Sequence, residues 1–302
     1  MTKIDDITIG IKTFNRESKI RQSLLKASKF SVNKIIVCDD GDISASQQEF
    51  YDEMRKDRSF QLIRPEYDVG LSEGRNLILE STETPFLLMI DDDQLIPENI
   101  SDLKEILVND ERLGGVSGFW HEHGRIICQA YDTYVSDRVL VKTIPRRKKE
   151  KFNSLSYYVA DHIPNSTLFR TSCLIASPWD PFYKIGYEHE DFYLSHKLLD
   201  KWLFAVTPDV IINHVPEGER HYDQNFRQKK ERIDRSREHF LRKWNLDDVI
   251  GGLPLKGWTA ASLLIQLIIS TGFSGKNSLL IKNKIAKFAP KNIGRGTLRR
   301  PR

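Results

Sequence analysis

Short apolar runs alternate with longer stretches of helical periodicity along the first hundred residues. Four runs rich in apolar residues predict buried strands, at residues 7–11, 34–38, 60–63 and 85–90. The segments between them carry charged residues at helical spacing and predict helices, at residues 16–30, 46–58 and 72–81. Because strands separated by helices form parallel sheets with helices on both faces, this pattern predicts an α/β fold.

The rest of the chain is less regular. We expect two strands within residues 113–127, extended chain over 157–169, and two short strands at 204–206 and 210–213. Helices are expected at residues 97–109, 191–202 and 225–244, and a loop at the basic stretch 146–149. This organisation predicts a body over residues 1–250, made of halves 1–100 and 101–250, followed by a tail over 251–302.

Charge divides the chain in the same place. The sequence has 46 Lys and Arg against 42 Asp and Glu, yet residues 252–302 contain ten basic residues and no acidic one. Such asymmetry predicts a body with a distinct cationic tail. The three cysteines, Cys38, Cys128 and Cys173, form no CxxC pair, and the first ten residues lack the apolar core of a signal peptide. We therefore expect a cytoplasmic protein, without a disulfide framework.

The tail begins with sixteen uncharged residues, 258–273, fewer than the about 20 that span a bilayer. Two interpretations carry equal weight. The segment is an interfacial helix whose basic extension is drawn to anionic lipid at the inner face of the cell membrane. Alternatively, it packs on the body or on another subunit of an oligomer. Nucleic acid is not an expected partner, because no recognition motif accompanies the charge.

Two acidic clusters follow predicted strands. Asp91, Asp92 and Asp93 repel one another at the end of an apolar strand, and a divalent cation such as Mn²⁺ or Mg²⁺ would supply the missing counter-charge. The alternative is a solvated loop in which Asp91 caps the following helix. In Asp39-Asp40-Gly41, one carboxylate would bind a nucleotide, although Asp-Gly is also a common turn.

A third acidic stretch, Glu188 to Asp191, precedes a predicted helix. A carboxylate there is suited to act as a general base or simply to cap the helix. His214 alone is more typical of a core or surface histidine than of a ligand. Aromatic residues concentrate in the second half of the chain, and sugar rings stack on such side chains. Trp179 and Tyr187, with Gly186 beside them, are the candidates for contact with an acceptor.

Six motifs, taken in order, resemble the inverting family 2 glycosyltransferases with the GT-A fold. The resemblance covers about residues 5–215 and rests on residues 9–16, 36–41, 70–76, 88–93 and 186–191 and on His214. It implies a Rossmann-like, mixed but mostly parallel sheet, with a nucleotide-sugar-binding half at 1–100 and an acceptor and catalytic half at 101–250. Lys12 is a departure, since the family often has an uncharged residue there.

The resemblance also implies roles for individual residues. Asp91 and Asp93 match the DxD motif, which holds Mn²⁺ or Mg²⁺ on the donor diphosphate, and His214 matches a histidine that completes the metal shell. Glu190 and Asp191 match the acidic pair whose Asp removes the acceptor proton. The positions expected to bind the UDP-sugar are Thr13, Asn15, Arg16, Asp39, Arg75, Asn76, Asp91 and Asp92.

The function implied is metal-dependent, inverting transfer of a hexose or N-acetylhexosamine from a UDP-sugar. The acceptor would be a hydroxyl of a glycan or lipid-linked glycan, in cell-surface polysaccharide synthesis. Two alternatives are an aspartate-nucleophile phosphatase, whose Asp-x-Asp motif is similar, and a non-catalytic nucleotide-sugar-binding module tethered to a membrane. The phosphatase motif should have Thr or Val where this chain has Leu95, which counts against it. The sugar and the linkage are not determined by the motifs.

Overall fold

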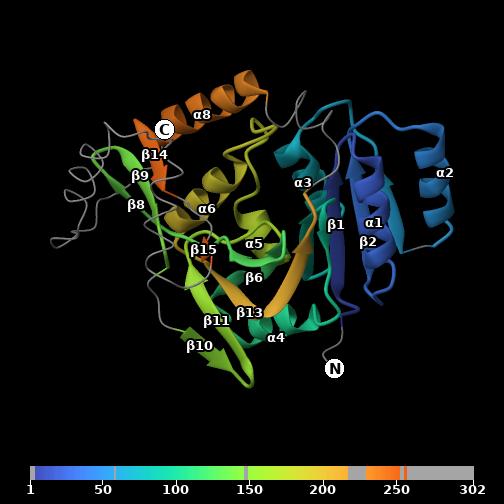
Figure 1. Cartoon of the computed structure of the whole chain (residues 1–302), viewed down its shortest axis with the longest axis horizontal. Coiled ribbons are helices and arrows are strands. Elements are labelled where there is room, and N and C mark those ends of the chain that lie inside the picture. Colours follow the sequence, from blue (N-terminus) through green and yellow to red (C-terminus); the bar gives the residue numbers. More distant parts are fainter. Residues whose placement is uncertain (1–3, 58, 146–148, 217–228, 252–254, 257–302) are drawn as a thin grey trace.

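The computed structural model describes residues 4–57, 59–145, 149–216, 229–251 and 255–256. Within these residues the centre of the protein is a twelve-stranded mixed sheet, which runs through both predicted halves (Figure 1). The predicted division of the chain near residue 250 stays a prediction, and the expected helix at 258–273 lies outside the described residues.

The first half forms the parallel part of the sheet. Its strands are β1 (Ile7–Thr13), β2 (Lys34–Asp39), β3 (Phe60–Ile63) and β4 (Phe86–Asp91). The helices between them are α1 (Glu17–Ala27), α2 (Ala45–Met54) and α3 (Leu71–Glu80). All seven residues of β1 are buried, because helices cover both faces of this part of the sheet. The α/β prediction for the first half is confirmed.

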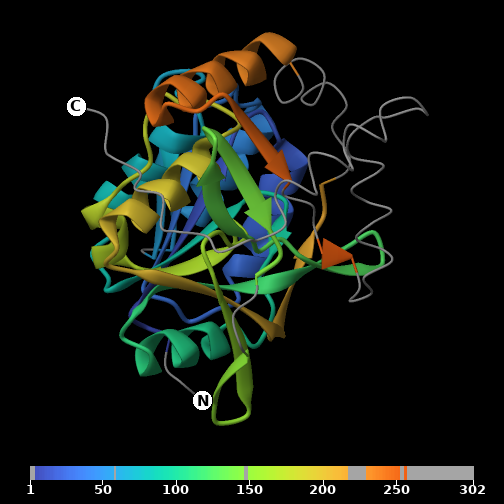
Figure 2. The same ribbon diagram turned by 90° about the vertical axis from the view of Figure 1, so that its left-hand side faces the viewer.

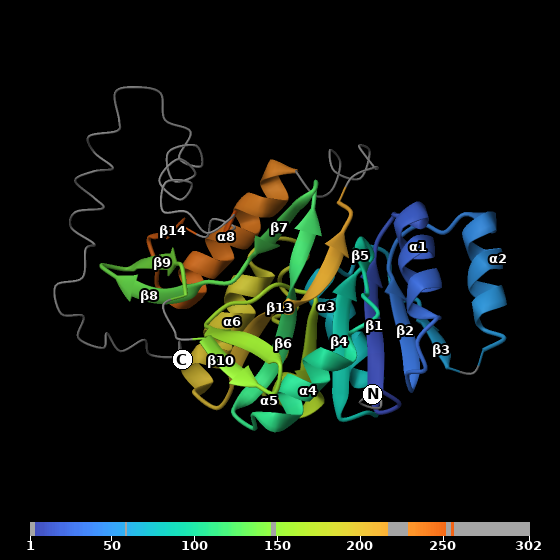
Figure 3. The same ribbon diagram turned by 60° about the horizontal axis from the view of Figure 1, so that its bottom comes forward.

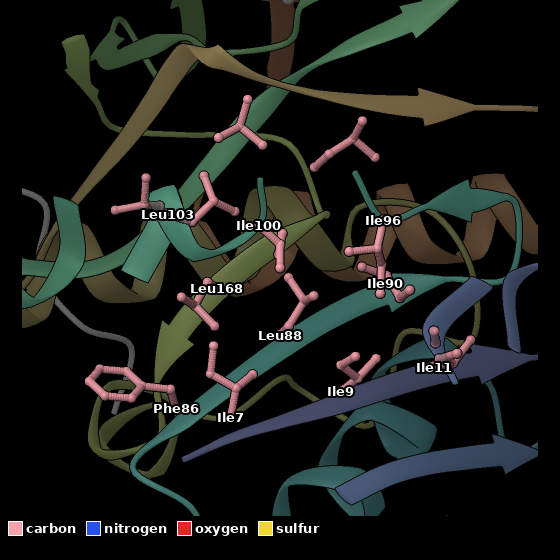
Figure 4. Close-up of a cluster of buried hydrophobic side chains, with 14 of the residues drawn as sticks. Ile7, Ile9, Ile11, Phe86, Leu88, Ile90, Ile96, Ile100, Leu103 and Leu168 are labelled. Carbon is pink, nitrogen blue, oxygen red and sulfur yellow. The ribbon is translucent and has the colours of Figure 1, made fainter. Parts of the chain in front are cut away.

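Two hydrophobic clusters sandwich the sheet. On one face, side chains of α1, α2 and α4 (Ser101–Asn109) pack on alternate residues of β1 and β4. Figure 4 shows this cluster, in which Ile7, Ile9 and Ile11 lie beside Leu88 and Ile90. On the other face, α3 packs with α5 (Thr171–Ala176) and α6 (Glu188–Leu199).

The second half extends the sheet with mostly antiparallel strands. Strand β12 (Thr167–Arg170) pairs antiparallel with β4 and β6 (Leu113–Glu122), and so joins the two halves. The remaining strands are β5 (Gln94–Leu95), β7 (Arg125–Cys128), β10 (Lys149–Phe152), β11 (Leu155–Ala160), β13 (Leu203–His214) and β15 (Leu255–Lys256). Lys149 therefore begins a strand rather than ending a loop, and residues 146–148 lie outside the described part.

Strand β13 is one element where the sequence predicted two. Its parallel pairing with β6 is interrupted between Thr207 and Ile211 by a register shift. Pro208 lies in this interruption, and proline cannot donate a hydrogen bond to the ladder. The pause in the sequence pattern is therefore a bulge within a continuous strand.

A smaller, three-stranded sheet lies at the other end of the molecule from β1 to β3 (Figure 3). It consists of β8 (Asp132–Ser136), β9 (Val139–Thr143) and β14 (Asp248–Gly251). Figure 2 shows it below α8 (Lys230–Trp244). Leu140 of β9 packs with Phe240 and Trp244 of α8 in a third hydrophobic cluster. This sheet was not predicted from the sequence. Among the described residues, no helix is long and apolar enough to cross a membrane.

Candidate active site

The predicted polar segments meet at one edge of the sheet, where β1, β2 and β4 end. These strands are parallel and in register, with Thr13 beside Asp39 and Lys12 beside Asp91. A cavity of about 710 Å³ lies at this edge, as expected for ligand sites in such sheets. Its lining includes Thr13, Arg16, Asp91, Asp92, Asp93, His162, Gly186, Glu188, His189 and His214.

The three aspartates after β4 are each held by side chains of other segments. Asp92 accepts hydrogen bonds from Thr13 Oγ1 and from Arg16 Nη1, both at 2.6 Å. The same Arg16 nitrogen lies 2.9 Å from Asp93 Oδ2. Asp91 accepts from Arg75 Nη2 at 2.9 Å and from Asn165, so it does not cap α4. The cluster is thus fixed by two arginines rather than exposed as a solvated loop.

Burial and these partners shift the pKa values of Asp92 and Asp93 in opposite directions. Burial raises the pKa of Asp92, against the charge of Arg16. Burial also acts to raise the pKa of Asp93, but the hydrogen bond with His214 and the charge of Arg16 outweigh it and hold that pKa below its usual range. Asp93 therefore keeps its negative charge at neutral pH, which a metal ligand requires.

His214 reaches the aspartates from β13. It ends β13, which pairs with β5 so that His214 lies beside Gln94. Its Nε2 lies 3.5 Å from Asp93 Oδ1, while its Nδ1 lies 2.7 Å from Glu122 Oε2. A carboxylate on the second ring nitrogen is the usual way in which proteins fix a ligating histidine. Glu122 was not predicted from the sequence as a site residue.

The donor types at this corner fit a divalent cation. Asp91 and Asp93 offer carboxylate oxygens and His214 offers an imidazole nitrogen, and Mn²⁺ accepts both. In the arrangement observed, no group of three or more His, Cys, Asp or Glu side chains among the described residues converges on one metal position. The carboxylates are instead drawn to Arg16 and Arg75.

The segment after β2 is shaped by buried partners. Asp39 accepts from Tyr51 Oη at 2.9 Å and from the Gly41 amide at 3.0 Å, and burial raises its pKa. Asp40 accepts from Lys12 Nζ and from the Gly70 amide, the latter at 2.9 Å. Asp39 itself is not among the residues that line the cavity. Its predicted contact with the UDP-sugar would therefore require a different orientation of its carboxylate.

Gly74 of α3 leaves the space that the Lys12 side chain occupies. That side chain is buried and passes beneath Gly74, where an added Cβ would come within 2.2 Å of Lys12 Cε. Asn15 adopts a left-handed conformation, with φ 52°, and its Oδ1 accepts from the Asp42 amide at 2.6 Å. The departure from the family pattern at position 12 is thus accommodated by glycine on the facing helix.

The site residues predicted on α3 and in the loop before α6 lie in different surroundings. Arg75 is buried and bridges two acids, because its Nη1 also lies 3.8 Å from Glu188 Oε1. The Asn76 amide makes two hydrogen bonds with the backbone of Trp179, at 2.8 and 3.1 Å, and so holds this loop in place. Trp179 is 2% exposed and stacks on Phe192, which places its ring in the core rather than in the cavity.

The acidic stretch at the start of α6 divides between two environments. Glu188 lines the cavity, as does Gly186, whereas Tyr187 packs against Phe240. Glu190 is paired with Lys142 of β9. Asp191 is 2% exposed and is not among the cavity residues. Its carboxylate accepts hydrogen bonds from Tyr183 Oη at 3.2 Å, Lys243 Nζ at 2.9 Å and Trp244 Nε1 at 2.8 Å.

Comparison with protein families matches residues 8–174, more than half of the chain, to Glycosyl transferase family 2. The chain belongs to this family. Membership confirms the resemblance to family 2 that the motifs indicated. None of the curated proteins compared with the chain matches it.

Solved structures confirm the GT-A fold at low sequence identity. S. aureus TarS 1-349 is 16% identical with a TM-score of 0.51, over 69% of this chain and 60% of that one. The same fragment in complex with UDP-GlcNAc gives 15% and 0.56, over 80% and 67%. GalNAc-T7, solved with UDP, GalNAc and Mn²⁺, gives 13% and 0.58, over 70% and 43%. This chain thus spans less than two thirds of the first TarS structure.

Proposed function

We propose that the protein transfers a hexose or N-acetylhexosamine from a UDP-sugar to a hydroxyl of a glycan or lipid-linked glycan, with inversion at the anomeric carbon. The observation that carries this proposal is the cavity itself, which is lined both by the three aspartates at the end of β4 and by Glu188 at the start of α6. The UDP-GlcNAc and UDP ligands of the TarS and GalNAc-T7 structures support a UDP-linked donor. Cell-surface polysaccharide synthesis would use such a reaction.

The donor would bind against the ends of β1, β2 and β4. Thr13 and Arg16 line the cavity beside Asp91 and Asp92, and the segment at Asp39 and Asp40 lies at the adjacent strand end. The aromatic pair of Phe14 and Tyr67, with ring centroids 5.3 Å apart, offers an apolar surface next to this segment. Polar groups on one side and rings on the other suit a nucleotide, whose base is flat and whose ribose is polar.

Asp91, Asp93 and His214 would hold the divalent cation, with Glu122 orienting the histidine. When bound, the cation supplies positive charge that stabilises the departing diphosphate without a proton. The chain contributes cations of its own at this corner, Arg16 and Arg75, which keep the aspartates in place. Metal binding would compete with these arginines for the same carboxylate oxygens.

Calorimetry tests the function before the sugar is known. The full chain should bind UDP in the presence of Mn²⁺ and bind it much more weakly in EDTA. A screen of UDP-sugars for UDP release then identifies the donor, and the anomeric configuration of the product reports inversion. Absence of UDP binding under both conditions would contradict the proposal.

We also propose that the basic tail draws the enzyme to anionic membranes at the inner face. The proposal is supported by charge alone, because each basic residue near such a surface contributes about 1 kcal/mol. The full chain should sediment with anionic liposomes, and replacement of Lys282, Lys284, Lys287 and Lys291 by Gln should release most of it. Liposomes of neutral lipid serve as the control. Equal sedimentation of both proteins would favour packing of the tail on the body or on another subunit.

A further inference from the structure

An amide side chain from the second half of the chain holds one oxygen of Asp91. Strand β12 pairs antiparallel with β4, with Thr167 beside Met89, and continuing that register brings Asn165 opposite Asp91. The Asn165 side chain donates from Nδ2 to Asp91 Oδ2, while Arg75 Nη2 donates to Asp91 Oδ1 at 2.9 Å. Both Asn165 and Asp91 line the cavity. Each oxygen of this carboxylate therefore has a donor, and one of the two donors comes from a residue that the motifs did not indicate.

Gln94 fixes which end of the Asn165 amide faces the aspartate. The backbone amide of Asp91 can only donate, and it donates to Gln94 Oε1 at 3.0 Å. The other end of the Gln94 side chain is therefore its NH₂ group, which donates to Asn165 Oδ1 at 2.8 Å. With its oxygen occupied in this way, Asn165 presents its own NH₂ group to the Asp91 carboxylate. The orientation of both amides thus follows from one backbone N–H group.

Gln94 is itself held by the elements around it. It is 1% exposed and belongs to β5, where its backbone lies beside His214 in the antiparallel pairing with β13. Ser23 Oγ of α1 donates to the Gln94 carbonyl oxygen at 3.1 Å. Gln94 is therefore tied to two of the residues expected to hold the cation, to Asp91 through its side chain and to His214 through its strand.

The backbone that carries Asn165 is held on both sides as well. Thr167 Oγ1 donates to the Pro164 carbonyl oxygen at 2.6 Å. Ser117 Oγ of β6 donates to the Ser166 carbonyl oxygen at 2.7 Å, and both serines are fully buried. A group on a fixed backbone loses little conformational entropy when it forms a hydrogen bond. The Asn165 donor is therefore already in place before any ligand binds.

A neutral donor orients a carboxylate without cancelling its charge. Arg75 brings a positive charge that a cation must compete with, whereas the Asn165 amide brings none. An ionised carboxylate has about four lone-pair positions on its two oxygens, so two donors do not exhaust what Asp91 can accept. Hydrogen-bond partners behind a metal ligand typically account for about 10–100-fold in metal affinity. The amide at Asn165 is of the chemical type that suits this position.

We propose that Asn165 and Gln94 are positioning residues for the cation site, and that they act on Asp91 as one amide relay. The inference rests on the proposed function, in which Asp91 is a ligand of the divalent cation. Gln94 orients the Asn165 amide, and Asn165 holds the Asp91 carboxylate in the orientation in which it lines the cavity. The relay contributes to the affinity for the cation rather than to the step in which the sugar bond breaks.

The test is a double-mutant cycle on the full chain, with Asn165→Leu, Gln94→Met and the double variant. Electron paramagnetic resonance of free Mn²⁺, with UDP in excess, measures the affinity for the cation. Asn165→Leu should lower that affinity about 10–100-fold. The double variant should bind Mn²⁺ no more weakly than the weaker single variant, because Gln94 acts through Asn165. Gln48→Met is the matched control, since Gln48 also donates to an aspartate, Asp52, but on the exposed face of α2.

Thermal unfolding separates positioning from folding. Gln94→Met leaves the buried backbone amide of Asp91 without its acceptor and should lower Tm by about 2–6 °C. Asn165→Ala should lower Tm less, because water from the cavity can take the place of the amide, and should still lose Mn²⁺ affinity. If Gln94→Met does not fold, loss of Mn²⁺ affinity in both Asn165 variants supports the assignment, and no loss in either overturns it.

The remaining outcomes also decide the assignment. Mn²⁺ affinity of Asn165→Leu and Asn165→Ala at the unmodified value overturns it. Losses of affinity that simply add in the double variant would show that the two amides act separately, and also overturn it. An unmodified enzyme that binds no Mn²⁺ in the presence of UDP overturns the metal dependence of the proposed function, and this assignment with it.

Discussion

The two sides of the cavity hold their carboxylates in different ways. On the donor side, Asp92 has two side-chain donors within 2.6 Å, and Asp40 is buried with a lysine and a backbone amide. On the side of α6, and counting only the described residues, Glu188 has nitrogens at 3.5 and 3.8 Å from Oε1 and no hydrogen-bond partner at Oε2. Full pairing fixes a carboxylate in position, whereas incomplete pairing leaves one of its oxygens without a donor. The two sides of the cavity thus differ in how completely their carboxylates are hydrogen-bonded.

The largest effect is expected from the donor side. Asp93→Asn removes a charge that His214 and Arg16 hold in place, so the cation should lose a ligand. We expect Mn²⁺-dependent UDP binding to disappear in calorimetry, and UDP release to fall about 10³-fold, which corresponds to about 4 kcal/mol. Asp52→Asn, on an exposed helix face, is the control. Metal-dependent binding that survives in Asp93→Asn would remove Asp93 from the metal site.

The second prediction concerns stability on the same side. Lys12→Met leaves the buried Asp40 carboxylate without its cation, which should cost about 3–5 kcal/mol of unfolding free energy. The double variant with Asp40→Asn removes the uncompensated charge and should recover much of that loss. Denaturant unfolding of the two single variants and the double variant measures both values. Losses that simply add would show that the pair is not coupled, contrary to its geometry.

A smaller effect should come from the support of His214. Glu122→Ala removes the acceptor at Nδ1, and loss of such a partner typically costs about 10–100-fold in metal affinity or activity. Glu122→Gln keeps an oxygen for the ring nitrogen and should recover part of the loss. Titration of UDP release with Mn²⁺ measures both variants. Identical Mn²⁺ dependence in all three proteins would mean that Glu122 does not orient the metal ligand.

The pattern of the chain predicted the first half well because β1, β2 and β4 are short, apolar and almost wholly buried. It failed at β13, where Pro208 interrupts the pattern without ending the strand, and at the hairpin of β8 and β9. The turn of that hairpin has left-handed conformations at Asp137 and Arg138, with φ 48° and 62°, but lacks the Asn-Gly or Asp-Gly signal of such turns. The residues of this turn therefore give no hairpin signal, and the three-stranded sheet was not predicted.

Prediction of the site residues from the sequence has the same limit. The motifs located Asp91, Asp93 and His214, and the structure brings them to one cavity. They could not say which of four neighbouring residues from 188 to 191 faces that cavity. That choice depends on the left-handed turn at Gly186 and Tyr187, and on Lys243 and Trp244, some fifty residues away, which draw Asp191 to α8.

The order of strands and helices in the first half, the acidic residues at the strand ends and the family could all be predicted from the residues, because these features depend on neighbours along the chain. The pairing of each carboxylate depends instead on residues that folding brings together. Arg16, Arg75 and Glu122 come from three separate segments, and whether a buried acid is neutralised or left with an open oxygen depends on which of them reaches it. The charge state of a buried group is set by the side chains around it in the fold, and the order of residues along the chain does not identify those side chains.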